Sequence, residues 1–175
     1  MTADLTLFLP DEAATTRLGA VLAGFLAAGD CLLLAGPIGA GKSHLARALI
    51  QTRLGRAEEV PSPSFTLVQT YEADGPESGG VDIWHVDLYR LSHPDQALEL
   101  GLSAAFDTAI TLVEWPDRLG SAAPEFALRL TLALEGDGRR ATVSAPRRPD
   151  LIAALAAAFG AETGLETGLE AGLDA

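Results

Sequence analysis

The segment 36–43, Gly-Pro-Ile-Gly-Ala-Gly-Lys-Ser, constrains the fold more than any other part of the sequence, because it fits G-x-x-x-x-G-K-[ST] at every fixed position. The apolar run 31–35 before it predicts a buried strand, and residues 44–50 after it carry apolar side chains at helical spacing. Glycines let a backbone wrap around an anion with its N–H groups pointing inward, and the following helix start adds unpaired donors. The alternative is a chance Gly-rich turn, but the strand–loop–helix context favours a nucleoside polyphosphate site.

The same segment supplies the candidate ligands of that site. Lys42 is predicted to reach the outer phosphates, and the hydroxyl of Ser43 to bind Mg²⁺. The backbone N–H groups expected to contact phosphate belong to Gly36, Gly39, Ala40 and Gly41.

Two carboxylates compete for the metal and water chemistry. Glu114 follows the apolar strand predicted over 109–113, and Asp87 ends a strand predicted within 81–88. An acid at the carboxyl end of such a strand can bind Mg²⁺, orient its water shell or position an attacking water, whereas an isolated one usually faces solvent. Beside a P-loop, both acids become candidate catalytic residues, together with Lys42, and candidate metal ligands, together with Ser43. The sequence does not divide the roles between Asp87 and Glu114.

Two neighbours of these acids can be explained by an ordinary structural role as well as by a functional one. His85 is interpreted as structural rather than as a general base, because a single histidine in a strand is usually part of the packing. Trp115 either shields the site or contacts a partner, or is core material, and both interpretations stay open.

The remaining elements follow from periodicity and turn residues. Asp11 or Thr15 is expected to cap a helix through Leu26, and Pro61 to Ser64 to form a loop. Residues 1–160 are predicted to form one P-loop domain, and the acidic repeats of 161–175 a mobile tail. Other predicted elements are strands at 65–72 and 81–88 around an acidic loop or hairpin, a helix from Pro94, a hairpin of 126–134 with 139–145, and a helix from Asp150 to about Gly160.

The composition limits which binding partners and which cellular compartment are expected. The net charge of −12 argues against direct, nonspecific binding of nucleic acid, which needs a basic surface. We expect no membrane segment and no secretory signal, because the apolar runs are short and the first residues lack the signal pattern. The single cysteine, Cys31, is predicted to be buried, which suits a reducing cytoplasm.

Four segments together resemble a known family. They are the P-loop, Val60-Pro-Ser-Pro-Ser-Phe-Thr-Leu-Val68, His85-Val-Asp-Leu-Tyr-Arg90 and Val113-Glu-Trp-Pro116. In this order and spacing they are similar to TsaE (also called YjeE), the bacterial ATPase family required for making threonylcarbamoyladenosine in tRNA. The resemblance covers roughly residues 5–158 and is far more specific than a P-loop alone.

The resemblance implies an α/β, P-loop NTPase-like three-layer fold, with a mostly parallel central sheet and antiparallel additions. It implies that the chain binds ATP and Mg²⁺ and hydrolyses ATP weakly. It also implies that the chain acts in a complex with TsaD and TsaB, which transfer a threonylcarbamoyl group to the adenosine 3′ of the anticodon in tRNA. Contact with tRNA would be indirect, through that complex. Further residues would border the nucleotide: Ser64 in a switch-like loop 62–65, and Glu12, Thr15 and Arg139.

The sequence departs from the family pattern at three positions. Ser43 replaces the usual threonine, and either hydroxyl can bind Mg²⁺. Ser64 also stands where threonine is usual, which weakens its interpretation as a nucleotide sensor. Pro37 replaces a frequent acidic residue and has no assignable role.

Two other functions remain as alternatives. A small-molecule kinase would need an acceptor pocket and an Arg-rich lid, for which the pairs Arg139-Arg140 and Arg147-Arg148 are poorly placed near predicted strands. A nonhydrolysing nucleotide-dependent adapter is close to the favoured interpretation. A GTPase is disfavoured, because the chain has no asparagine and so cannot carry the guanine-reading Asn-Lys-x-Asp motif.

Overall fold

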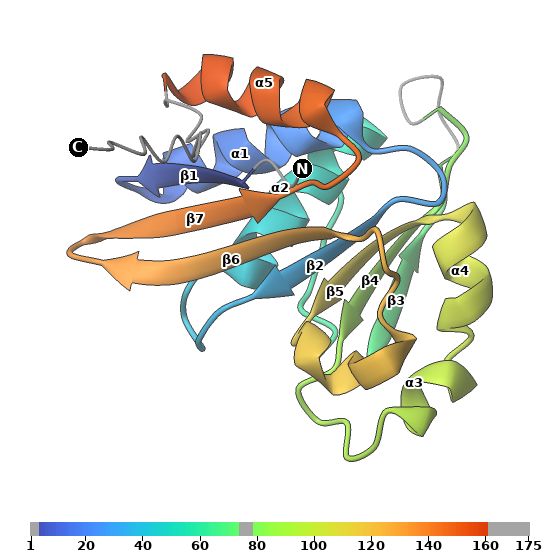
Figure 1. Cartoon of the computed structure of the whole chain (residues 1–175). Helices are drawn as coiled ribbons and strands as arrows, with labels where there is room; N and C mark the ends of the chain where they lie inside the picture. Colours follow the sequence, from blue (N-terminus) through green and yellow to red (C-terminus); the bar gives the residue numbers. More distant parts are fainter. Residues whose placement is uncertain (1–3, 74–78, 161–175) are drawn as a thin grey trace, which may run out of the picture.

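A seven-stranded sheet runs through the computed structural model, which describes residues 4–73 and 79–160 (Figure 1). The strands lie in the order β1-β7-β6-β2-β5-β4-β3. They are β1 (Asp4–Leu9), β2 (Cys31–Ala35), β3 (Val68–Tyr71), β4 (Ile83–Asp87), β5 (Ile110–Glu114), β6 (Leu128–Glu135) and β7 (Gly138–Ser144).

The centre of the sheet is parallel and its margins are antiparallel. β2 pairs in parallel with β5 and with β6, and β5 pairs in parallel with β4. β3 runs antiparallel to β4 at one edge, and β7 runs antiparallel to both β6 and β1 at the other. The predicted fold class, a mostly parallel sheet with antiparallel additions, is confirmed.

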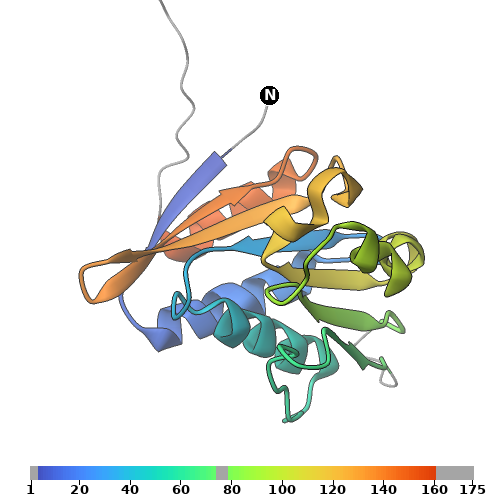
Figure 2. The same cartoon turned by 90° about the horizontal axis from the view of Figure 1, so that it is seen from below.

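Helices cover both faces of the sheet (Figure 1 and Figure 2). One face carries α1 (Glu12–Phe25), α2 (Lys42–Leu54) and α5 (Pro149–Phe159). The other carries α3 (Asp95–Glu99), α4 (Leu102–Thr108) and the 3₁₀ helix η1 (Pro116–Ala122). The result is three layers with two apolar cores.

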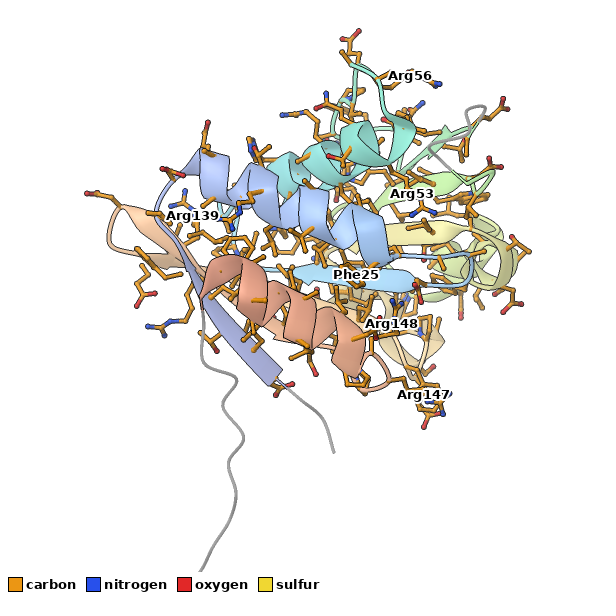
Figure 3. All side chains as sticks on the ribbon, turned by 90° about the horizontal axis from the view of Figure 1, so that it is seen from above. Phe25, Arg53, Arg56, Arg139, Arg147 and Arg148 are labelled. Atoms are coloured by element: carbon orange, nitrogen blue, oxygen red, sulfur yellow. The ribbon has the colours of Figure 1, made fainter. Side chains whose placement is uncertain are left out.

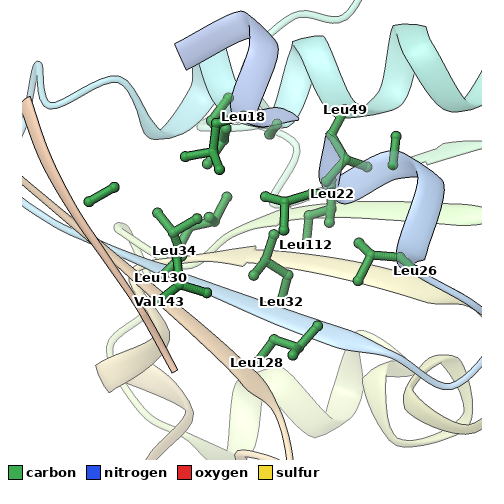
Figure 4. Packing of buried hydrophobic residues seen from close by; sticks show 14 of the residues in the cluster. Leu18, Leu22, Leu26, Leu32, Leu34, Leu49, Leu112, Leu128, Leu130 and Val143 are labelled. Carbon is green, nitrogen blue, oxygen red and sulfur yellow. The ribbon is translucent and has the colours of Figure 1, made fainter. Parts of the chain in front are cut away.

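Strand β2 explains why there are two cores. Leu32 and Leu34 join the core under α1 and α2 (Figure 4), whereas Cys31 and Leu33 join the core under α3, α4 and η1. Side chains alternate between the faces of a strand, so a strand covered on both sides is apolar throughout. The predicted burial of Cys31 is confirmed, since it is 3% exposed.

Several boundaries differ from the sequence-based predictions. The strand predicted from Phe65 begins only at Val68, because residues 64–66 form a turn in which the Leu67 N–H donates to the Pro63 carbonyl at 2.8 Å. The helix predicted after Pro94 is two helices, separated at Gly101, whose φ of 82° is left-handed. Strand β1 was not predicted at all.

Other predictions hold. Asp11 caps α1 by accepting a hydrogen bond from the Ala14 N–H at 2.8 Å, and Thr15 lies inside the helix. The hairpin of β6 and β7 and the last helix are present. The predicted tail 161–175 lies outside the described residues, so its separation from the domain stays a prediction. In the described ranges, no helix combines the length and apolar character needed to cross a membrane.

Candidate functional site

The P-loop joins the carboxyl end of β2 to the start of α2 and depends on its glycines. Gly36, Gly39 and Gly41 have φ values of 144°, 80° and 103°, which side-chain-bearing residues rarely adopt. A Cβ on Gly36 would also lie 2.4 Å from the carbonyl oxygen of Leu132 in β6. The loop therefore has a fixed shape, in which α2 begins at Lys42 without an acidic residue in its first turn.

Lys42 is held against this loop. Its Nζ donates to the carbonyl oxygens of Gly36 and Pro37, at 2.5 Å and 2.9 Å, and lies 4.2 Å from the centroid of the Trp115 ring. Burial lowers the pKa of Lys42, while the charges of Glu114 and Asp87 oppose that shift. Two carbonyls and an aromatic face thus orient the ammonium group.

The two predicted carboxylates face each other at the ends of neighbouring strands. Asp87 and Glu114 are register partners in the parallel pair β4 and β5, so their side chains leave the same face of the sheet. Both are buried, at 5% and 2% exposure. Burial raises the pKa of Asp87 and the charge of Glu114 adds to the rise, whereas the N–H of Tyr89, 3.0 Å from Oδ1, opposes it.

Ser43 connects the P-loop to Glu114. The Ser43 hydroxyl lies 2.9 Å from Oε1 and 3.1 Å from Oε2 of Glu114, so it donates to one end of that carboxylate or is shared between both. Residues that are 71 positions apart in the sequence therefore meet at the start of α2. Hydroxyl and carboxylate oxygens are the ligands that Mg²⁺ prefers.

A segment that leads to the switch-like loop is fastened along α2. Arg47 Nε donates to the Val60 carbonyl at 3.1 Å, and one turn later Gln51 Nε2 donates to the Glu58 carbonyl at 2.9 Å. These bonds hold segment 58–60 antiparallel to the helix, with its continuation directed toward the start of α2.

Two cavities flank the P-loop. The first, of about 340 Å³, is lined by loop residues and by Asp87, Tyr89, Glu114 and Trp115. The second, of about 390 Å³, lies between the loop, the start of α1 and the β6–β7 hairpin. Together they provide space on both sides of the P-loop backbone.

Arg139 ties the β6–β7 hairpin to the P-loop at the second cavity (Figure 3). Its Nε donates to the Ala40 carbonyl and its Nη2 to the Gly39 carbonyl, both at 3.2 Å. Glu12 and Thr15, from the start of α1, line the same cavity. Three residues predicted to border a nucleotide thus come together beside the loop.

Comparison with known proteins gives one consistent family. The family model described as "Threonylcarbamoyl adenosine biosynthesis protein TsaE" matches residues 9–142. The chain belongs to the TsaE family. This match contains the P-loop, both strand-end carboxylates and Arg139.

Individual TsaE relatives agree with the family match. The chain is 37% identical over 111 residues to the tRNA threonylcarbamoyladenosine biosynthesis protein TsaE of Rickettsia felis, covering 63% of this chain and 62% of that protein, less than two thirds of its length. It is 32% identical over 127 residues to TsaE of Treponema pallidum, covering 72% and 89%. The crystal structure of Bacillus subtilis YdiB superposes with a TM-score of 0.73 at 25% identity, covering 91% and 98%.

Most of the residues predicted from the TsaE resemblance gather at the P-loop. Ser64 is the exception. It is half-buried in a turn, and the described residues that line the two cavities do not include it. The residue of that loop nearest the site is Ser62, whose hydroxyl lies 3.5 Å from that of Ser43.

The sequence favoured a structural role for His85 and left Trp115 undecided, and it did not predict the contacts that both residues make. His85 Nε2 lies 2.8 Å from Oε1 of Glu114, and Trp115 forms part of the wall of the first cavity. The position of His85 two residues before Asp87 was the available signal, since residues i and i+2 share a strand face. The sequence did not predict that Asp11, His44 and Asp137 line the second cavity; Asp11 was expected only as a helix cap.

Proposed function

We propose that the chain binds ATP with Mg²⁺ at the P-loop and hydrolyses it slowly, as the ATPase subunit of tRNA threonylcarbamoyladenosine biosynthesis. The observation that carries this proposal is the contact of the Ser43 hydroxyl with Glu114, beside the ammonium group of Lys42. This arrangement joins a phosphate-binding loop to a strand-end acid, which is the minimum that a P-loop ATPase needs.

The residues present suit a triphosphate. The left-handed conformations of Gly39 and Gly41 leave open space beside the loop, because the described residues outside their chain neighbours place no atom within 4 Å of a Cβ at either position. The start of α2 adds N–H donors and the positive end of its dipole. Lys42 is the only lysine in the sequence, and it lies in this loop.

The residues present also suit a hydrated metal ion rather than a metal held by protein alone. Within residues 4–73 and 79–160, no three His, Cys, Asp or Glu side chains form a metal-binding group. Ser43, Glu114 and Asp87 would therefore provide part of the shell of Mg²⁺, with phosphate and water oxygens completing it. When bound, Mg²⁺ neutralises charge on the phosphates.

The composition of the first cavity supports slow hydrolysis by the chain alone. The described residues that line it include Lys42 but no arginine, and Arg139 is engaged with carbonyls of the loop. An arginine that stabilises the transferring phosphoryl group is worth about 10³–10⁵ in rate in related enzymes. A partner would then supply the missing charge or order the site.

The partners that we propose are TsaD and TsaB, with tRNA bound by them and not by this chain, in the cytoplasm. The net charge of −12 supports an indirect relation to tRNA. Ile38 and Phe65, which are 72% and 80% exposed, lie in the P-loop and the switch-like loop and offer apolar contacts for another protein.

The test uses the single lysine. Acylation of Lys42 by an amine reagent, followed by peptide mass spectrometry, should be blocked by ATP with Mg²⁺ at low millimolar concentrations. Hydrolysis should be slow, should rise when TsaD and TsaB are added, and should vanish in Lys42→Ala but not in Arg140→Ala, a surface control. Lack of ATP protection, or unchanged turnover in Lys42→Ala, would refute the site. Consumption of ATP only with a small acceptor would indicate a kinase instead.

A further inference from the structure

A completely buried histidine stands behind Glu114. His85, in β4, is 0% exposed, and its Nε2 lies 2.8 Å from Oε1 of Glu114 in the adjacent strand β5. Glu114 is itself only 2% exposed. The contact is therefore shielded from water, and its geometry is set by the pairing of two central strands.

Two side chains satisfy this carboxylate. Across residues 4–73 and 79–160, the hydrogen bonds to Glu114 side-chain oxygens come from the Ser43 hydroxyl and from His85. A buried carboxylate without donors is strongly unfavourable, so both contacts restrict its orientation. Ser43 is also the hydroxyl expected at the metal, whereas His85 reaches Glu114 from the neighbouring strand β4, within the sheet layer.

We propose that His85 is a positioning residue for the metal-binding function of Glu114. By donating from Nε2 to Oε1, it fixes the side-chain rotamer of Glu114, in an orientation that keeps both carboxylate oxygens within reach of the Ser43 hydroxyl, at 2.9 Å and 3.1 Å. Outer hydrogen bonds of this kind orient metal ligands in many proteins, and their removal typically costs 10–100-fold in metal affinity or activity. This proposal rests on the proposed function.

The geometry also assigns the proton on the ring. Nδ1 of His85 is buried and has no hydrogen-bond partner in the described part of the chain. A proton on Nδ1 would be a buried donor without an acceptor, whereas a proton on Nε2 is used by Glu114. The ring is therefore the Nε2–H tautomer in the protein without nucleotide.

The functional test compares two variants with a matched control. His85→Leu removes the donor, whereas His85→Gln places an amide N–H near the position of Nε2. Thr111→Val is the control, because Thr111 is equally buried in β5 but its side chain leaves the opposite face of the sheet from Glu114. No hydrogen bond joins its hydroxyl to the described residues around Glu114.

We expect His85→Leu to raise the Mg²⁺ concentration for half-maximal hydrolysis by about 10–100-fold. ATP affinity measured in EDTA should not change, because Lys42 and the loop are untouched. His85→Gln should restore most of the Mg²⁺ dependence, and Thr111→Val should leave it unchanged. Equal Mg²⁺ dependence in wild type and His85→Leu would overturn the proposal, as would a loss that His85→Gln does not repair.

A second measurement does not depend on activity or on the stability of a variant. Nitrogen-15 NMR of the ring in the wild-type protein without nucleotide should show the Nε2–H tautomer, and an Nδ1–H ring would contradict the proposed contact. Failure of the proposed function is distinguishable, because wild type would then lack ATP protection of Lys42 whatever the state of His85.

Discussion

Helices α1 and α2 approach each other closely at Gly19, and replacing this residue tests the packing that holds the P-loop helix. A Cβ at this position would lie 2.9 Å from Ala48 Cβ, 2.9 Å from the Leu45 carbonyl oxygen and 3.0 Å from the Leu49 nitrogen. Two of these atoms are backbone, so Gly19→Ala must displace α2 itself. Overpacking costs about 1–3 kcal/mol, and we take the upper end here. Since alanine favours a helix over glycine by about 1 kcal/mol, the net loss is about 2 kcal/mol.

Gly24, in the same helix, provides the matched control. It is exposed, and the described structure places no atom within 4 Å of a Cβ there, so Gly24→Ala gains up to about 1 kcal/mol of helix preference. For a domain of this size, each kcal/mol shifts Tm by about 2–4 °C. Circular dichroism melts should therefore show Gly19→Ala lower by about 4–8 °C and Gly24→Ala slightly higher. A Gly19→Ala protein as stable as wild type would refute the close approach of the two helices.

Three further predictions concern stability and reactivity. Burial raises the pKa of Cys31 to about 11, so the native thiol should resist iodoacetamide at pH 8 and react only after unfolding in urea; rapid labelling of the native protein would contradict this. Burial raises the pKa of Asp87 in the folded protein, so ionising this carboxyl lowers the free energy of unfolding at a pH above the folded pKa. This loss disappears as the pH falls toward the pKa of the unfolded chain, about 3.9. Asp87→Asn should therefore raise the urea midpoint at pH 7, with a gain that shrinks on acidification, and an unchanged midpoint at pH 7 would be evidence against it. Arg148 bonds to Asp30 at 2.9 Å and to the Phe25 carbonyl at 2.7 Å (Figure 3), so Arg148→Ala should lower the free energy of unfolding by about 1–3 kcal/mol. The exposed pair of Arg140 with Glu135 should contribute less than about 1 kcal/mol, and equal losses in the two alanine variants would speak against this ranking.

The predictable parts of the fold are those with local signals. The apolar strands β2 and β5 and the β6–β7 hairpin follow from runs, alternation and turn residues within short windows. β1 also carries a local signal, since buried Leu5, Leu7 and Leu9 alternate with exposed residues. The late start of β3 had none, because Leu67 adopts a φ of 65° that leucine rarely takes, held by bonds to Pro63 and to Asp87 from another strand.

The candidate site likewise contains contacts that the sequence could predict and contacts that it could not. That Ser43, Asp87 and Glu114 should meet was predictable, because carboxyl ends of parallel strands and a P-loop share one edge of the sheet. The contact of His85 with Glu114 depends on which residues of β4 and β5 are level, and register is set by distant packing. The approach of Ser62 rather than Ser64 depends on a turn whose geometry no local pattern specified.

A glycine at position 36 is required by the packing of the P-loop against β6, independently of ligand binding. Its side-chain space is occupied by the carbonyl of Leu132, a backbone group of β6. A descendant of this chain that had ceased to bind anything would still have to keep that glycine in order to fold. If a diverged homologue retains the first glycine of the motif, this indicates only that the strand packing is retained. Whether the homologue has kept its activity is better judged from the residues at the positions of Lys42 and Ser43.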